Sequence, residues 1–407
     1  MSEATSAPSR GPLFLLAGCH ASLHWVMATF YVLLPFIQQS LELTYAQAGL
    51  LASVVHFSSF ASNIPSGAVV DMTGRRVACQ LTSLLAAAAA MFVMGFSASF
   101  WMVAAMTAIL AAMNTLWHPA AISYLSDRYR EQRGTALSYH TVGASIGDAL
   151  APLAIGAVVT WQGWQAATYT AASAPLVAAI IVLLMLNPAR RTNMADAGGA
   201  ATAFIDYLRK LRGMLSSTTI WVIGTLAGLR GTAQVGMRTF VPLYVVNELG
   251  ANAVWVGAIL LVFQGSGAVM TPIAGSLSDR LGRGPVFMTG LAVAAVAIAA
   301  MPSAGSLWIY AVLVGIVGAS LLALRPVVQG WALDQTPPEL GGSTISLLFT
   351  MQAAFGMAVP VVGGIVADQH GLDTTFMLMA LMAGVASAAT WLAHLWLKRQ
   401  DAEAASA

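Results

Sequence analysis

Long apolar runs, separated by short charged or turn-forming clusters, follow one another along almost the whole chain. A run of about 20 residues is long enough, as a helix, to cross about 30 Å of hydrocarbon. The pattern predicts twelve transmembrane helices. We expect them at residues 13–39, 47–70, 77–97, 99–126, 133–160, 164–187, 217–246, 252–277, 285–302, 305–333, 341–367 and 372–397.

The composition excludes a water-soluble fold. Hydrophobic residues make up 58% of the 407 residues and charged residues only 8%, whereas about a quarter of an ordinary soluble domain is charged. The first apolar run is too long for a signal-peptide core, so we interpret it as the first span. Cys19 and Cys79 lie in separate runs, with neither metal-type nor disulfide-type spacing. We therefore expect an all-α polytopic membrane protein with no metal, no cofactor and no nucleic-acid partner.

One long polar stretch, between the sixth and seventh runs, divides the chain. It predicts an N-terminal six-helix bundle at 1–189, a cytoplasmic linker at 190–216 and a C-terminal six-helix bundle at 217–407. Within the linker, apolar residues recur at helical spacing over 204–211, with basic residues opposite them. This pattern fits a short amphipathic helix on the membrane surface, and a plain linker remains the alternative.

The basic residues define an orientation. Fifteen of the 18 Lys and Arg residues fall in the termini, the linker, and the connections between spans 2 and 3, 4 and 5, and 8 and 9. In a twelve-span chain these segments all lie on one side of the membrane, so the positive-inside rule places both termini in the cytoplasm. The other three, Arg230, Arg238 and Arg325, fall within spans.

The two halves repeat each other at an offset of 207 or 208 positions. Duplicated six-helix halves are typical of transporters that bind their substrate near the midplane of the membrane. A proline bends each half at the matching place, presenting His118 in one half and Arg325 in the other. The matched stretches are Gly67-AVV-Asp71-MT-Gly74-Arg75-Arg76 with Gly275-SLS-Asp279-RL-Gly282-Arg283, and His118-Pro119 followed by Asp127 with Arg325-Pro326 followed by Asp334.

The stretch 67–76 resembles the loop motif of the major facilitator superfamily, and 275–283 resembles its echo in the second half. The resemblance extends to the helix count, the central linker and the repeat. It implies the major facilitator fold, with two pseudo-symmetric six-helix bundles, and a loop that steadies one gating state. The residues to which it assigns this gating role are Gly67, Asp71, Gly74, Arg75, Arg76, Gly275, Asp279, Gly282 and Arg283.

WHPAAISYLSDR at 117–128 and RGTALSYHTVGASIGDALAP at 133–152 resemble the corresponding stretch of bacterial fosmidomycin-resistance transporters. The glycines around Pro152 also follow the helix-five pattern of antiporters, which slightly favours export, although Ala151 stands where that pattern has Gly. The fourth span lacks the arginine that many drug/proton antiporters carry there. Proton coupling must therefore use other residues. We interpret the glycines of the fifth span as packing devices.

Polar residues inside the spans are the candidates for function, because a charge at the bilayer centre costs about 3 kcal/mol or more outside a wet cavity. The family resemblance implies a cavity lined by helices one, four, seven and ten. Fixed cations suit an anionic substrate, and groups that titrate near neutral pH suit proton coupling. We expect substrate binding by Arg325, Arg230, Arg238, His24, His118, Gln264 and Gln352. We expect proton coupling by Asp148, His140 and His56, and helix bends at Pro119, Pro326 and Pro152.

These assignments have alternatives. Arg238 lies near the outer end of its span and can extend to the interface. His20 and His140 can be hydrogen-bonded packing residues. Asp148 can carry a proton or can pair with an arginine as an inter-helix lock.

Together these features favour a monomeric secondary transporter, not an enzyme. We expect it to move a small organic anion across the inner membrane by alternating access, coupled to protons, with efflux slightly favoured. Uptake of a carboxylate with protons and multidrug efflux of neutral or mixed compounds are the alternatives. A membrane metal enzyme is least favoured, because most histidines are single and dispersed and the repeat is left unexplained. Carboxylates are scarce for divalent-metal transport, and no GxxxxGK[ST] loop supports direct ATP drive.

Overall fold

The computed structural model describes residues 10–187, 209, 212–213, 215–336 and 341–406, and its regular structure there is entirely helical. Two short 3₁₀ turns, η1 (Arg130–Gln132) and η2 (Met301–Ser303), accompany the long helices. The long helices are α1 (Gly11–Ser40), α2 (Tyr45–Thr73), α3 (Arg76–Met94), α4 (Phe100–Arg128), α5 (Arg133–Met185), α7 (Thr218–Asn247), α8 (Ala253–Leu281), α9 (Arg283–Ala300), α10 (Leu307–Asp334) and α11 (Gly341–Ser406).

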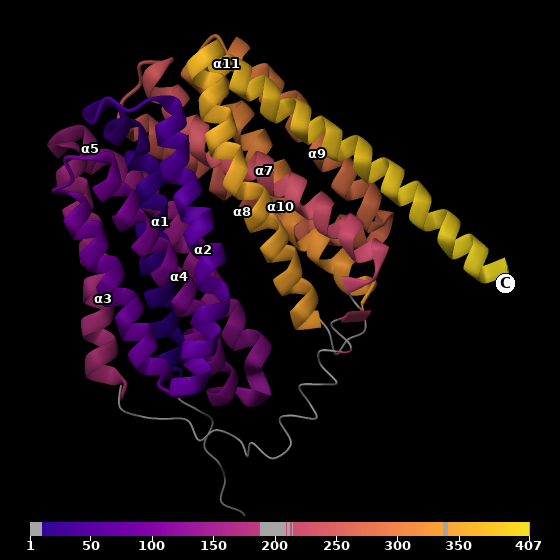
Figure 1. Cartoon of the computed structure of the whole chain (residues 1–407), viewed down its shortest axis with the longest axis horizontal. Coiled ribbons are helices and arrows are strands. Elements are labelled where there is room, and N and C mark those ends of the chain that lie inside the picture. The colour runs from indigo at the N-terminus through magenta and orange to yellow at the C-terminus, as the bar shows by residue number, and fades with distance from the viewer. Residues whose placement is uncertain (1–9, 188–208, 210–211, 214, 337–340, 407) are drawn as a thin grey trace, which may run out of the picture. The chain divides into compact units, whose positions relative to one another are not determined.

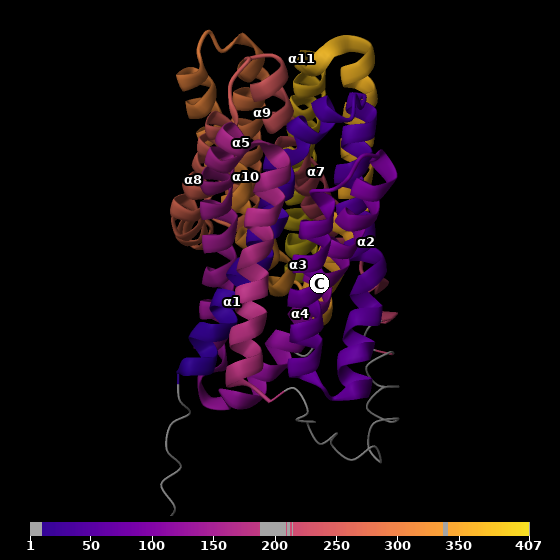
Figure 2. The ribbon, with the colours of Figure 1, turned by 90° about the vertical axis from the view of Figure 1, so that its left-hand side faces the viewer.

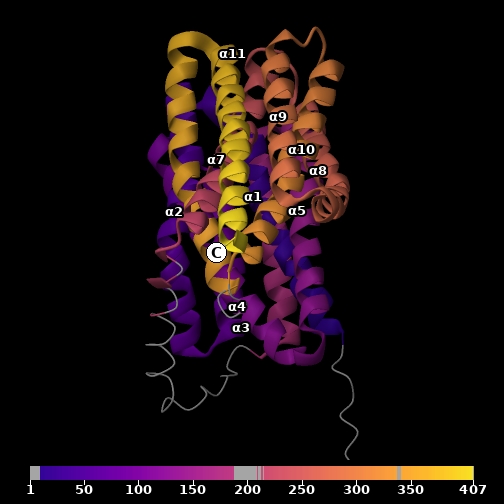
Figure 3. The same cartoon turned by 90° about the vertical axis from the view of Figure 1, so that its right-hand side faces the viewer.

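Two of these helices, α5 and α11, are each a pair of helices joined by a sharp turn. The turn residues, Gly163 and Gly371, both have φ of 82°, a left-handed backbone conformation that favours glycine. Figure 3 shows the two arms of α11 joined by their turn. When the arms are counted separately, the described residues hold twelve long helices. The predicted all-α, twelve-helix membrane fold is therefore confirmed.

Eight described segments are long and apolar enough to cross a membrane by length and composition, and two of them are the double-armed α5 and α11. The helices α2 and α7 are not among the eight. Both carry several polar side chains, including Arg230 and Arg238 on α7.

The chain folds into two compact units. The first combines 1–37 with 58–194, and the second combines 38–57 with 195–407. The first half of α2 therefore belongs to the second unit, and the rest of α2 belongs to the first. Figure 1 follows the chain from indigo α1 to yellow α11. The linker predicted at 190–216, with its amphipathic helix, lies almost entirely outside the described residues.

Within the first unit, α3 lies against α4 and α5, and the helices of this unit are labelled in Figure 2. Two glycines of α5 face α1. A Cβ added at Gly143 would meet the backbone oxygen of Ala17, and one added at Gly147 would meet that of Ala21. Small residues at these points let the two helix backbones approach closely, so packing is a role that these glycines do fulfil.

Within the second unit, α7 lies against α11, α8 lies against α10, and α9 lies against both α10 and α11. The first half of α2 packs on α11, where a Cβ at Gly49 would overlap the backbone oxygen of Pro360. The carboxylate of Asp368 accepts hydrogen bonds from the backbone N–H groups of Tyr45 and Ala46, at 2.8 and 2.9 Å. An acid at this position satisfies the free N–H groups and the positive end of the α2 dipole.

Candidate functional site

A completely enclosed arginine is the most unusual group of the second unit. Arg230, on α7, exposes only 1% of its surface. Its Nη1 donates to Oε1 of Gln234 at 2.8 Å and to the backbone oxygen of Leu321 on α10 at 2.9 Å. Its Nη2 donates to Oε1 of Gln352 on α11 at 2.8 Å. The guanidinium therefore joins α7 to α10 and α11 through neutral acceptors, and no described acid pairs with it.

Two further arginines lie in the same unit. Arg325, on α10, is exposed, and its Cζ lies 5.3 Å from the ring centre of Phe349 on α11, within the range of a cation–π contact. Its charge interacts repulsively with that of Arg230. Arg238, on α7, is half-buried and acts electrostatically on His56 of α2. All three sequence-predicted arginines thus lie in this unit, and Arg230 is the one that is fully buried.

Unused polar atoms accompany these cations. Nε of Arg230 and Nε2 of Gln352 are both buried without a hydrogen-bond partner among the described residues. Both atoms are donors, so the group that complements them is an acceptor. On α8, the buried Oε1 of Gln264 also has no described partner. Of the residues predicted to bind substrate, Arg230 and Gln352 are therefore in direct contact and leave two donors free.

Four histidines gather in the first unit: His20 and His24 on α1, His118 on α4 and His140 on α5. The ring of His20 stacks on that of His140, with ring centres 3.8 Å apart. It meets His24 and His118 edge to face, at 4.7 and 5.1 Å. Trp117 stacks beside His140 with ring centres 6.2 Å apart. The expectation that most histidines are dispersed was wrong, because three helices bring these four together.

In three of these four rings, Nδ1 lies within contact distance of an oxygen atom. Nδ1 of His20 lies 2.7 Å from the backbone oxygen of His140. Nδ1 of His118 lies 2.7 Å from the backbone oxygen four residues earlier in its own helix. Nδ1 of His24 lies 3.2 Å from a carboxylate oxygen of Asp148 on α5. Because a carbonyl oxygen can only accept, Nδ1 carries the proton in His20 and His118, and Nε2 holds the lone pair in the neutral rings.

The predicted proton carriers do not lie together. Asp148 and His140 belong to the histidine cluster of the first unit, whereas His56 belongs to the second unit, beside Gly356. The buried Nε2 of His56 has no described partner. Sequence reasoning underrated His20, which lies at the centre of the cluster. Its spacing of one helical turn from His24 was the available signal.

The loop motif forms an equivalent ion pair in each half. Arg76, at the start of α3, pairs with Asp127 near the end of α4. Arg283, at the start of α9, donates from Nε to Asp334 at the end of α10, at 3.1 Å, and both pairs are separated by 51 residues. Arg283 also pairs with Asp279 at 2.6 Å. Partial burial opposes the charge of Arg283, but the two carboxylates raise its pKa above the usual value.

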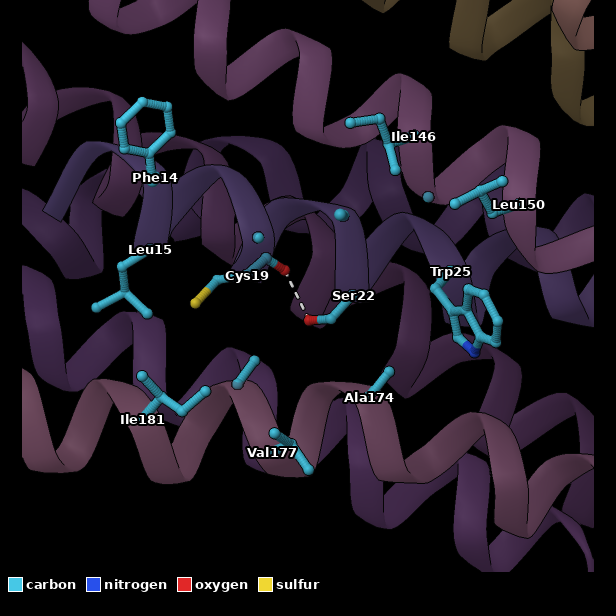
Figure 4. A pocket seen from close by; sticks show the side chains of 14 residues that line it. Phe14, Leu15, Cys19, Ser22, Trp25, Ile146, Leu150, Ala174, Val177 and Ile181 are labelled. Atoms are coloured by element: carbon cyan, nitrogen blue, oxygen red, sulfur yellow. Dashed lines mark hydrogen bonds between the residues drawn. The ribbon is translucent and has the colours of Figure 1, made fainter. Parts of the chain in front are cut away.

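An apolar pocket of about 430 Å³ lies beside α1 in the first unit, between α1 and the two arms of α5 (Figure 4). Phe14 and Trp25 of α1 stand at its rim, and the drawn hydrogen bond runs from the hydroxyl of Ser22 to the backbone oxygen of Cys19, at 2.7 Å. No charged side chain is among its lining residues. This pocket therefore does not suit a charged solute.

A family model described as Major Facilitator Superfamily matches the sequence at residues 16–273 and 248–407. The match therefore extends through both units and nearly the whole chain.

Similar proteins match over most of their length. The uncharacterized MFS-type transporter YfnC of Bacillus subtilis is 24% identical, over 91% of this chain and 90% of its own. The multidrug resistance protein MdtG of Serratia proteamaculans is also 24% identical (89% and 90% covered), and the phosphoglycerate transporter protein of Salmonella typhimurium is 23% identical (88% and 83%).

The fold also has counterparts among solved structures. A bacterial homologue of the human lysosomal transporter Spinster, in an inward-facing and unoccupied conformation, matches with a TM-score of 0.81. The match covers 95% of this chain and 97% of that one, at 17% sequence identity. At this identity the likeness shows the fold alone.

Proposed function

Because the chain belongs to the major facilitator superfamily, we propose that it is a secondary transporter for a small organic anion. The proposal places it as a monomer in the bacterial inner membrane, with both termini in the cytoplasm and with alternating access driven by protons. Membership of the family makes it a multi-pass membrane transporter, and the substrate, coupling ion and orientation are the proposed part.

The enclosed charge of Arg230 carries the proposal. An ionised group removed from water is strongly destabilising unless it is paired. Arg230 has three neutral acceptors and no described acid, and a second cation, Arg325, adds to the positive charge. A bound anion would neutralise this region and would accept from Nε of Arg230 and Nε2 of Gln352, the donors that are unused.

The chemistry of a carboxylate or phosphate fits these donors, because planar guanidinium groups recognise both through paired hydrogen bonds. The relative described as a phosphoglycerate transporter supports this class, since its substrate carries both groups. Multidrug efflux remains the second candidate, because MdtG relatives cover a similar share of the chain. The two candidates differ in the charge of the compounds that bind.

Export is favoured slightly over uptake. The glycine pattern around Pro152 in α5 and the His118-Pro119 stretch support the resemblance to fosmidomycin-resistance transporters. Uptake of a carboxylate together with protons is the alternative direction. Of the predicted proton carriers, we retain His56 for this role, because it lies in the same unit as the arginines.

The first experiment is a thermal-stability screen of the purified, full-length protein against anionic, neutral and cationic compounds. A specific ligand raises the melting temperature by mass action, and we expect carboxylates or phosphonates to do so. Arg325→Ala should remain folded in the membrane and lose transport of the identified anion. Stabilisation by cationic or neutral drugs alone, or normal anion transport by Arg325→Ala, would contradict the proposal.

Coupling is tested in liposomes that contain the purified protein. An imposed pH gradient should drive accumulation of the anion, and a protonophore should abolish that accumulation. If the anion accumulates when protons flow in the same direction, the mechanism is co-transport. If it accumulates when protons flow in the opposite direction, the mechanism is exchange. Accumulation that is independent of pH would refute proton coupling and leave anion binding unaffected.

A further inference from the structure

The histidine cluster of the first unit has a geometry that anion transport does not use. One ring nitrogen from each of His20, His24 and His118 lies within 4.8 Å of the other two. The three rings come from two helices, since His20 and His24 lie one turn apart on α1 and His118 lies on α4, directly before Pro119. Such a triangle of imidazole nitrogens is the ligand set of many sites for divalent transition metals.

The outer contacts of these rings match what a metal site requires. A metal-binding histidine usually donates its other ring N–H to a carboxylate or a backbone carbonyl, which fixes the ring orientation. Here Nδ1 of His20 and Nδ1 of His118 face backbone oxygens at 2.7 Å. Nδ1 of His24 faces the carboxylate of Asp148 at 3.2 Å. In each ring Nε2 is the nitrogen on the side away from this oxygen contact, so it is the atom that we assign to the metal.

A buried ring nitrogen without a hydrogen-bond partner argues against a role in packing alone. His20 exposes only 4% of its surface, and its Nε2 has no hydrogen-bond partner in the described part of the chain. A buried acceptor without a partner is destabilising, and a bound metal ion would remove this penalty. The side chain of His24 is 22% exposed, which leaves a route by which an ion can enter.

We propose that His20, His24 and His118 bind a divalent transition-metal ion of the zinc class through Nε2, with Asp148 orienting His24. Three neutral imidazoles without a thiolate suit zinc, cobalt or nickel better than magnesium or calcium, which prefer oxygen ligands. Zinc–nitrogen bonds of about 2.0–2.1 Å put the nitrogens of a tetrahedral site roughly 3.3 Å apart. The triangle of nitrogens, now within 4.8 Å of one another, would therefore have to contract when the ion binds.

The ion would join α1 to α4, and through Asp148 it would also fix α5. This lies beyond the proposed anion transport, because all four residues belong to the first unit and the arginines belong to the second. Pro119 directly follows His118 on α4, so this ligand lies where the helix lacks one backbone hydrogen-bond donor.

The test uses the full-length protein in detergent, with its affinity tag removed and its metal stripped by a chelator. Co²⁺ is titrated while the d–d absorption of tetrahedral cobalt is followed, and Zn²⁺ is then added in competition. We expect one ion to bind per chain and zinc to displace cobalt. His24→Ala and His118→Ala should abolish the tetrahedral signal. Asp148→Asn, which alters an outer contact, should weaken binding by about 10- to 100-fold.

His370→Ala is the matched control, because His370 is an exposed histidine in the second unit and should leave the affinity unchanged. His24→Gln and His118→Gln keep a polar side chain and replace any alanine variant that does not fold, as judged by gel filtration. Absence of metal binding, or equal affinity in the His24 and His118 variants, would overturn the proposal. No transport substrate is needed, so failure here leaves the anion proposal standing.

Discussion

Nη2 of Arg230 donates to Oε1 of Gln352 at 2.8 Å, and this contact ties α7 to α11 around a charge that has no described acid as partner. The remaining donors, Nε of Arg230 and Nε2 of Gln352, are buried and unused. A pair that is held in place and retains unused donors is suited to ligand recognition. It is poorly suited to stability, because the arginine charge is only partly compensated.

Replacing the arginine separates binding from stability. Arg230→Gln removes the charge, so we expect anion affinity to fall by the worth of a charged hydrogen bond, about 1.5–3 kcal/mol, or roughly tenfold to a hundredfold. The melting temperature without ligand should stay equal or rise, because an uncompensated buried charge has been removed. Ligand-dependent thermal shifts measure both quantities. A large loss of stability with unchanged anion affinity would show that Arg230 is only structural.

Arg230→Lys tests whether anion binding depends on the planar guanidinium geometry as well as on the charge. Lysine keeps the positive charge but cannot reach Gln234, Leu321 and Gln352 with fixed, divergent N–H groups. We expect weaker anion binding than in the native protein, and a lower melting temperature than that of Arg230→Gln.

In Gln352→Glu, the new carboxylate should compete with the substrate anion for Arg230. The new carboxylate would accept from Nη2 of Arg230, so the protein would carry its own counter-ion. We expect a higher melting temperature without ligand and an anion affinity reduced at least tenfold, with the loss largest above the pKa of the new carboxyl. Gln352→Leu is the control, because it removes the acceptor without adding charge. Equal anion affinities in Gln352→Glu and the native protein would separate the substrate site from Arg230.

The helices were predictable because their signal is local. A run of apolar residues and its flanking charges identify each span without knowledge of its neighbours, so the two arms of α5, divided at Gly163, agree with the predicted spans 133–160 and 164–187. The repeat was also visible, yet its register in the loop was not. Arg76, not Arg75, is the structural counterpart of Arg283.

The histidine cluster depends on information that the sequence does not contain. Helical spacing places His20 and His24 on one face, but it cannot tell which faces of α4 and α5 approach them. The approach of α5 depends on Gly143 and Gly147 lying on the backbone of α1. His140 can therefore stack on His20, although 120 residues separate the two in the chain.

The two equivalent ion pairs of the loop motif should contribute similar amounts to the free energy of unfolding. Arg283–Asp334 and Arg76–Asp127 are partly exposed pairs at the ends of helices, so each should contribute no more than about 1 kcal/mol. Double-mutant cycles with alanine, read by thermal unfolding, should give similar small coupling energies for both, decreasing as salt is added. A coupling several times larger in one half would show that the two loops have diverged in structural role.

The contact between α5 and α1 gives the sharpest stability test. Gly143→Ala places a Cβ against the backbone oxygen of Ala17, which cannot move aside as a flexible side chain would. Overpacking of this kind is destabilising by about 1–3 kcal/mol, so the melting temperature should fall and the histidine cluster should loosen. Gly18→Ala is the control on α1, because its Cβ would meet nothing within 4 Å. Its melting temperature should stay equal or rise, since alanine favours a helix over glycine by about 1 kcal/mol. Equal melting temperatures in the two variants would mean that the α1–α5 approach is looser than the glycine contacts indicate.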